Sequence, residues 1–258
     1  MSLEGEDDDV LRYANHWARS DGRPLTVAAV VPPPSPVRPL LPHQAVFDAI
    51  GREALDACVA TLTSRCARVL GRESEAPIVL LGPHVAPGAD EANSGLRDLV
   101  ALDRAFAPAV YVADALPRIA SLLETPSRTS AVVRLGGQSR LRGPIVAVVR
   151  PGAVEVVVEA ALLAADREGV PICFIADGVP HAELMDAKTV AVGRVPARDT
   201  AVAVSVEVLD GDSVTEVRAQ AADLNASCLV VPWGDRYAND GVVARVLAEE
   251  ARRPMILV

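Results

Sequence analysis

A loop near the carboxyl end of the chain carries residue types that could bind phosphate. Gly234 and Arg236 fall between an apolar run at 228–233 and a helix expected over 241–252, and Gly241 is the first residue of that helix. In open α/β sheets, a loop that follows a strand and precedes a helix presents backbone N–H groups to anions. Its glycines would allow the backbone to approach a ligand closely. The position is therefore that of a phosphate-binding loop.

Three more residues complete the candidate ligand set. Arg150 and Gly152 directly follow one apolar run, and Asp177 directly follows the next. Arg150 and Arg236, near a helix N-terminus, could attract an anion other than a nucleotide. A simpler interpretation is also open, in which the glycines are turn residues and Trp233 fills the space that a nucleotide would need.

Other signals for catalysis are weak. His16 lies off the apolar stripe of its expected helix, and His84 and His181, which follow strands, have no acidic or nucleophilic partner at a suggestive spacing. We interpret His16 as a solvated helix residue and the other two as loop residues. No G-x-S-x-G, P-loop or G-x-G-x-x-G motif is present. We therefore expect that the chain is not an enzyme.

The four cysteines indicate a reducing compartment. Cys58 and Cys66 fall on one expected helix, roughly 12 Å apart, which is too far for a disulfide. Cys173 and Cys228 each fall inside an apolar strand. We expect buried, reduced thiols and a cytoplasmic protein. No CxxC or HxxxH spacing points to a metal site.

Composition excludes two classes of partner. The net charge of −9 over 258 residues argues against nucleic acid, because phosphate neutralisation needs clustered Lys and Arg. The most apolar stretch, 145–165, is interrupted by Arg150, Glu155 and Glu159, so it is not a membrane span. The acidic opening residues show no signal peptide.

Hydrophobic patterning predicts strands and helices that alternate along the chain. Expected helices cover 9–18, 43–70, 96–106, 116–124, 153–167, 214–224 and 241–252, and expected strands cover 24–31, 77–82, 108–113, 129–135, 144–149, 170–176, 201–208, 228–233 and 254–258. Residues 180–199 are expected to be irregular, with a short strand at 189–193. Short turns between these elements predict parallel sheets with helices on both faces.

The pattern occurs twice, which predicts two tandem α/β domains. "LVALDRAFAPAVYVAD" in the first half corresponds to "VRAQAADLNASCLVVPW" in the second, and "PRIASLLETPSRTSAVV" corresponds to "ARVLAEEARRPMILV". "ARSDGRPLTVAAVVPP" likewise corresponds to "AADREGVPICFIADGVP". The polar linker at 136–143 separates a domain at 1–138 from a domain at 139–258.

The second half, from Pro144 to Val258, resembles a universal stress protein domain. "PIVAVVRPGAVEVVVEAALLAADREGVPICFIADG" and the stretch from "VSVEVLDGDSV" to "RRPMILV" follow that family's pattern of strands, turns and helices. The first half is similar but has no counterpart of the first strand. The resemblance implies tandem Rossmann-like domains of the adenine nucleotide α-hydrolase type, the first of them lacking its first strand.

The same resemblance implies that nucleotide binding is lost. Family members that bind ATP carry G-x2-G-x9-G-S/T after the fourth strand. Here Trp233 stands at the first glycine, the spacing from Gly234 to Gly241 is shorter, and Val242 stands at the hydroxyl. Where such members end the first strand with Asp, this chain has Arg150. We therefore expect no cofactor, and no tight binding of ATP.

Three functions fit this pattern. The first is a non-catalytic, cytosolic stress or regulatory protein of the universal stress type. The second is the cytosolic regulatory domain of a membrane transporter, such as a cation/proton antiporter, and the missing strand favours it. The third is a nucleotide-binding enzyme of the adenine nucleotide α-hydrolase superfamily, which would need a working phosphate loop.

The expected edge strands suggest how the halves meet. Universal stress proteins pair the corresponding edges across a two-fold axis, so the resemblance implies that Thr129–Leu135 runs antiparallel to Pro254–Val258. This pairing would make the chain an internal pseudo-dimer, and a homodimer stays open as an alternative. An unpaired apolar edge would otherwise promote aggregation.

Overall fold

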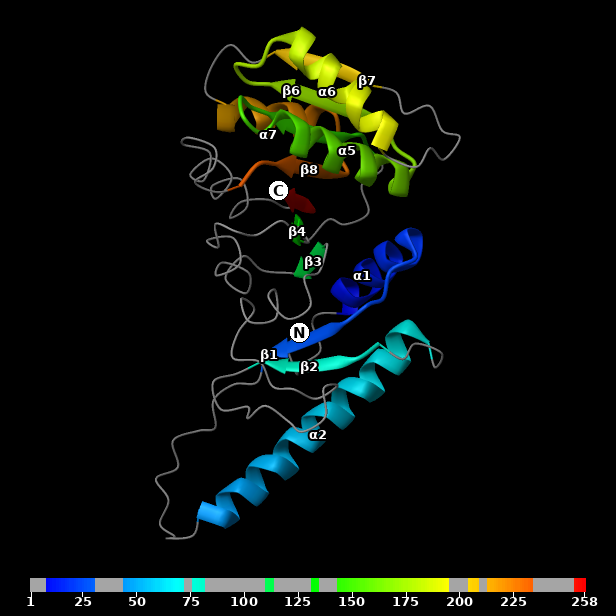
Figure 1. Ribbon diagram of the computed structural model, residues 1–258, viewed down its shortest axis with the longest axis vertical. Coiled ribbons are helices and arrows are strands. Elements are labelled where there is room, and N and C mark those ends of the chain that lie inside the picture. The colour runs from blue at the N-terminus through cyan, green and yellow to red at the C-terminus, as the bar shows by residue number, and fades with distance from the viewer. Residues whose placement is uncertain are drawn as a thin grey trace. The chain divides into compact units, whose positions relative to one another are not determined.

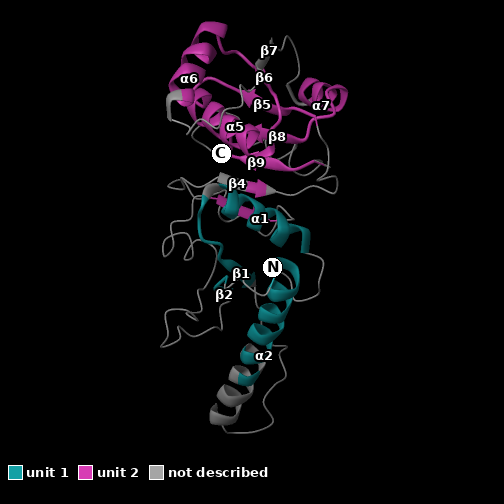
Figure 2. Ribbon diagram, turned by 90° about the vertical axis from the view of Figure 1, so that its right-hand side faces the viewer, with its two compact units in different colours: residues 1–106 teal, residues 107–258 magenta. Residues whose placement is uncertain are grey.

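The computed structural model describes residues 8–30, 44–71, 76–81, 110–113, 131–134, 143–194, 204–208, 213–233 and 253–258 (Figure 1). The chain is an α/β protein with parallel sheets and helices, as expected. It divides into two compact units, residues 1–106 and 107–258 (Figure 2). The expected helices at 96–106, 116–124 and 241–252, together with nearly all of the linker at 136–143, lie outside the described residues.

The first unit contains a small parallel sheet and two helices. Its described elements are α1 (Asp8–Asp21), β1 (Val27–Val30), α2 (Gln44–Leu70) and β2 (Ile78–Leu81), and β1 pairs with β2 in parallel. One apolar cluster joins all four elements, because side chains from both helices and both strands are buried against one another. Its members are Leu11, Val27, Ala29, Leu62, Cys66, Ile78 and Leu80.

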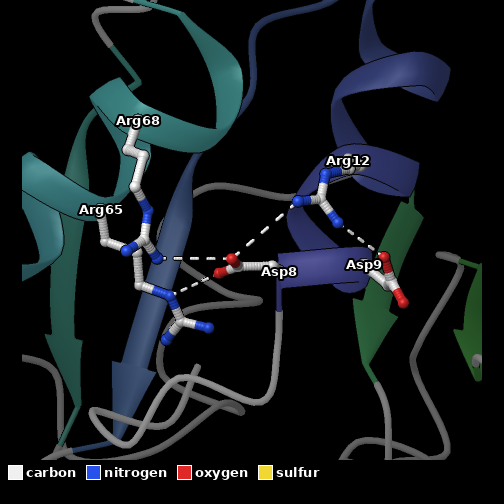
Figure 3. Close-up of polar contacts among 5 residues, drawn as sticks. All are labelled: Asp8, Asp9, Arg12, Arg65 and Arg68. Atoms are coloured by element: carbon white, nitrogen blue, oxygen red, sulfur yellow. Dashed lines mark hydrogen bonds and ion pairs between the residues drawn. The ribbon is translucent and has the colours of Figure 1, made fainter.

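An ion-pair cluster links the start of α1 to the end of α2 (Figure 3). Asp8 accepts a hydrogen bond of 2.7 Å from Arg65, whose side chain is only 7% exposed, and Arg68 lies 3.4 Å from the same carboxylate. Arg12 pairs with Asp9 at 2.8 Å on the surface of α1. The hydrogen bond from Arg65, with the charges of Arg65, Arg68 and Arg12, lowers the pKa of Asp8 although burial opposes this effect.

Replacing Asp8 with Asn should destabilise the first unit by about 1–2 kcal/mol, because the charged hydrogen bond between Asp8 and Arg65 would be lost. Since the pKa of Asp8 is lowered in the folded state, its contribution is complete above the unfolded value of 3.8 and disappears as pH falls through the folded pKa. Urea unfolding of both proteins between pH 7 and pH 2 measures the difference. Asp9→Asn is the matched control, with an expected cost below about 0.5 kcal/mol because Asp9 is 75% exposed. Equal losses in the two variants would contradict a special role for Asp8.

The second unit is built on a seven-stranded sheet with the order β3-β4-β9-β8-β5-β6-β7. All neighbouring strands are parallel except β4 and β9. The strands are β3 (Val110–Ala113), β4 (Ala131–Arg134), β5 (Ile145–Val149), β6 (Ile172–Ala176), β7 (Val204–Val208), β8 (Cys228–Val231) and β9 (Met255–Leu257), and the helices are α5 (Val154–Glu168), α6 (His181–Arg194) and α7 (Ser213–Asp223). Figure 2 shows α5 and α6 on one side of this sheet and α7 on the other.

The antiparallel pairing predicted between the two edge strands is confirmed. β4 runs antiparallel to β9, with Val132 opposite Leu257 and Val133 opposite Ile256. This pairing explains why β3 and β4 belong to the second compact unit, which begins at residue 107. The domain boundary at 138/139, which follows the sequence repeat, stays a prediction, and so does the pseudo-dimer.

The segment expected to be irregular is largely a helix. The interpretation of 180–199 is wrong where α6 covers His181–Arg194, including the short strand expected at 189–193. Val190 and Val192 suggested the alternation of a strand, but both side chains are exposed. The buried positions recur instead at helical spacing, and they are Leu184, Ala187 and Ala191.

None of the four cysteines, all of which the structure describes, forms a disulfide bond. Cys66, Cys173 and Cys228 are buried as expected, and Cys58 is half-buried. Burial raises the pKa of the Cys66 and Cys228 thiols. These two thiols therefore lack the thiolate character that reactive cysteines need.

Candidate functional site

The carboxyl end of β5 is the place where the second unit could accept a ligand. β5 lies between β6 and β8 in the sheet. The chain continues from β5 through α5 to β6 on one side and returns through β8 on the other. In open α/β sheets, ligands bind in the crevice outside the carboxyl ends of the strands where the strand order reverses in this way.

A charged residue directly follows the carboxyl end of each of the neighbouring strands β5 and β6. Val149 and Ala176, the last residues of the two strands, are register partners. Arg150 follows Val149, and Asp177 follows Ala176. The Asp177 backbone N–H donates to the Val149 carbonyl at 3.0 Å, so the strands stay paired up to these residues. An Arg150 guanidinium nitrogen lies 2.7 Å from a carboxylate oxygen of Asp177, and the two side chains are 15% and 30% exposed. An internal carboxylate therefore already binds the cation at this end of β5.

Gly152 forms the turn between β5 and α5. Its φ of 84° lies in the left-handed region, which favours glycine. The Ala153 N–H donates to the Arg150 carbonyl at 3.0 Å and closes the turn. Ala153 caps α5 without a side-chain hydrogen bond. The backbone conformation alone accounts for a glycine here.

Trp233 marks the point where the loop after β8 begins. Its backbone N–H donates to the Val258 carbonyl at 2.6 Å, and the Val258 backbone N–H donates to the Val231 carbonyl at 3.1 Å. The Trp233 residue is only 7% exposed. The bulky residue at the expected first glycine position is thus held inside the fold at the end of β8.

The structure brings together three of the six candidate residues, Arg150, Gly152 and Asp177. Gly234, Arg236 and Gly241 lie outside the described residues. Sequence reasoning placed Arg150 and Asp177 in one ligand set but did not pair them with each other. The signal was available, because residues that follow register partners in adjacent parallel strands lie side by side.

The described residues add no other chemical centre. Within them, no group of three or more His, Cys, Asp or Glu side chains could hold a metal ion. His16 and His181 are exposed, and His84 lies outside the described residues. In the described part of the chain, none of the helices is long and apolar enough to span a membrane.

Comparisons with known proteins agree with this architecture. No model of a known protein family matches the chain, and no curated protein matches it. Among solved structures, a universal stress protein from Archaeoglobus fulgidus is similar with a TM-score of 0.59 and 9% identity, over 100% of this chain and 94% of that one. A candidate universal stress protein from Pseudomonas aeruginosa UCBPP-PA14 has a TM-score of 0.53 and 13% identity, over 96% of this chain and 87% of that one.

A third similar structure is a protein of unknown function from Pseudomonas aeruginosa PAO1, with a TM-score of 0.50 and 14% identity, over 96% of this chain and 86% of that one. At such low identity these similarities concern the fold. The chain therefore has the α/β, Rossmann-like fold of the universal stress proteins.

Proposed function

We propose that this chain is a non-catalytic protein of the universal stress type, located in the cytosol, that does not use ATP. The similar solved structures support the type, and the four cysteines, which form no disulfide, support a reducing compartment. The two halves, joined through β4 and β9, act as an internal pseudo-dimer. The protein therefore works by docking to a partner or by binding a ligand that is not a nucleotide.

The ion pair between Arg150 and Asp177 is the observation that carries the proposal. A phosphate placed at the carboxyl end of β5 would face the Asp177 carboxylate and would compete with it for Arg150. The negative charges of the phosphate and of the Asp177 carboxylate would repel each other. Because the site is partly buried, this repulsion would be screened less than it is in water. The ion pair therefore does not contribute to the binding of a nucleotide phosphate at this place.

Calorimetric titration of the full chain with ATP and Mg²⁺ tests the proposal. We expect no binding tighter than about 1 mM, which corresponds to roughly 4 kcal/mol. A micromolar dissociation constant would overturn the proposal and would favour an enzyme of the adenine nucleotide α-hydrolase type.

The variant Asp177→Asn tests whether the ion pair between Arg150 and Asp177 is what excludes phosphate. Removing the carboxylate should raise the affinity for inorganic phosphate at least about tenfold, because the negative charge that competes with phosphate for Arg150 is gone. Adding Arg150→Gln to the same variant should abolish the gain. Glu155→Gln, which removes an exposed carboxylate from the first turn of α5, is the matched control for the change in net charge. An Asp177→Asn protein with unchanged phosphate affinity would show that the ion pair does not exclude the anion.

A further inference from the structure

Helix α1 is joined to α2 by an ion pair whose cation is buried. Arg65 Nε donates to one carboxylate oxygen of Asp8 at 2.7 Å, and Arg68 lies 3.4 Å from the other oxygen (Figure 3). Within the described ranges, Arg65 is the only charged residue that is buried. Such a pair is weak evidence for stability, because apolar residues of similar volume often stabilise a protein as well or better. Its best-attested use is to fix one arrangement or to act as a switch.

The apolar anchoring of α1 is sparse. Among its described side chains, only those of Leu11 and Trp17 are buried. In α5, the counterpart of α1 in the sequence repeat, seven of the fifteen residues are buried. Because the burial of an apolar face is the main force that holds a helix to its neighbours, α1 is held less firmly than α5. The ion pair with α2 therefore contributes a large share of what keeps α1 in place.

The connection from α1 to β1 is suited to act as a hinge. Gly22 directly follows α1 with a φ of 63°, and nothing lies within 4 Å of a Cβ built there. Residues 22–24 and Thr26 are exposed. Hinges are formed by a few loop residues that absorb changes in φ and ψ. Asp8 lies at the opposite end of α1, where a movement about this connection would be largest.

We propose that α1 is a displaceable lid on α2, held closed by the latch of Asp8 with Arg65 and Arg68. The lid opens without unfolding of the β1–β2 sheet. Opening uncovers Leu62 and Cys66 of α2, which belong to one apolar cluster with a leucine of α1. It also releases the two guanidinium groups of the latch, so the lid controls access to an apolar surface with two cations beside it. This inference concerns the first unit and does not depend on the proposed function.

Native-state hydrogen exchange of the full chain, at urea concentrations below the unfolding transition, tests the lid. The amides at 12–18 in α1 should open at least about tenfold more often than the hydrogen-bonded amides of the β1–β2 sheet, because local opening breaks fewer contacts than unfolding of the unit. Opening at 12–18 should depend only weakly on urea, since it exposes little surface. A thiol reagent should modify Cys66 at the opening frequency of 12–18.

Asp8→Asn should raise both the opening frequency at 12–18 and the labelling rate of Cys66 at least about fivefold, because the latch loses its negative charge. Asp9→Asn is the matched control, since Asp9 is 75% exposed and pairs with Arg12 of the same helix. It should change both rates less than about twofold.

Three results would overturn the proposal. The first is that α1 and the β1–β2 sheet open with the same frequency and the same urea dependence, because α1 would then leave only when the unit unfolds. The second is that Cys66 is labelled at the opening frequency of the sheet. The third is that Asp8→Asn and Asp9→Asn change the opening of α1 equally, because the latch would then not hold the lid.

Discussion

Gly143→Ala should destabilise the second unit by about 3 kcal/mol or more, in the upper range for overpacking of a core. A Cβ atom at Gly143 would lie 2.0 Å from the backbone oxygen and 2.5 Å from the backbone carbon of Asn225. Backbone atoms cannot rotate away as a flexible side chain would. The added methyl group would therefore have to separate the amino end of β5 from the turn that follows α7.

The turn at Asn225 has little freedom to move. Asn225 has a φ of 50°, in the left-handed region, and its N–H donates to the Ala222 carbonyl at 3.0 Å. The backbone two residues further on is bound to the residue that precedes β5, because the Ser227 N–H donates to the Pro144 carbonyl at 3.0 Å. A shift that relieves the contact would break the hydrogen bonds that align β5 with β8.

Urea unfolding measures the effect, and a loss of about 3 kcal/mol should lower the midpoint by about 1 M or more. Gly169→Ala is the matched control. Gly169 follows α5 with a φ of 64°, and nothing lies within 4 Å of a Cβ built there. Its cost should be only about 1 kcal/mol, from the backbone conformation alone. If both variants lost the same stability, the close approach at Gly143 would not be the cause.

The strands could be predicted because the sequence carries their signals locally. β5, β6 and β8 are unbroken apolar runs, which is typical of parallel strands buried on both faces. The pairing of β4 with β9 followed from the resemblance, because both segments occupy the edge position of their half. α6 was missed because Val190 and Val192 alternate along the chain as they would in a strand, and only tertiary contacts show that the opposite helix face is buried.

The candidate site was harder to predict, because its key contact depends on register. The 2.7 Å pair of Arg150 with Asp177 arises only when Val149 and Ala176 are partners, and a shift of one residue would separate the charges. The apolar runs in the sequence indicate that Arg150 and Asp177 each follow a strand, but they do not show that the two charges neutralise each other. The position of Trp233 inside the fold likewise depends on the backbone bond from Trp233 to Val258 at the end of β9.

Leu257→Asp should prevent stable folding of the second unit. The Leu257 side chain is completely buried, and its residue is the register partner of Val132 in β4 and Val231 in β8. Losing the apolar burial costs about 1.5–3 kcal/mol, and an unpaired buried carboxylate adds several more. A total above about 4 kcal/mol is a large part of the 5–15 kcal/mol that stabilises a typical domain. The variant should also aggregate, because β4 and β8 would each lose a partner along one edge.

Circular dichroism during urea unfolding and light scattering during refolding measure the two effects. Leu257→Asn should destabilise the protein less than Leu257→Asp, because asparagine has the shape of aspartate but carries no charge. Val156→Asp is the matched control for adding a carboxylate. Val156 is 38% exposed in the first turn of α5, where the helix dipole favours a negative charge, so its stability should stay within about 0.5 kcal/mol of the parent protein. A Leu257→Asp protein as stable as the parent would mean that Leu257 faces solvent, and the antiparallel pairing of β4 with β9 would then be wrong.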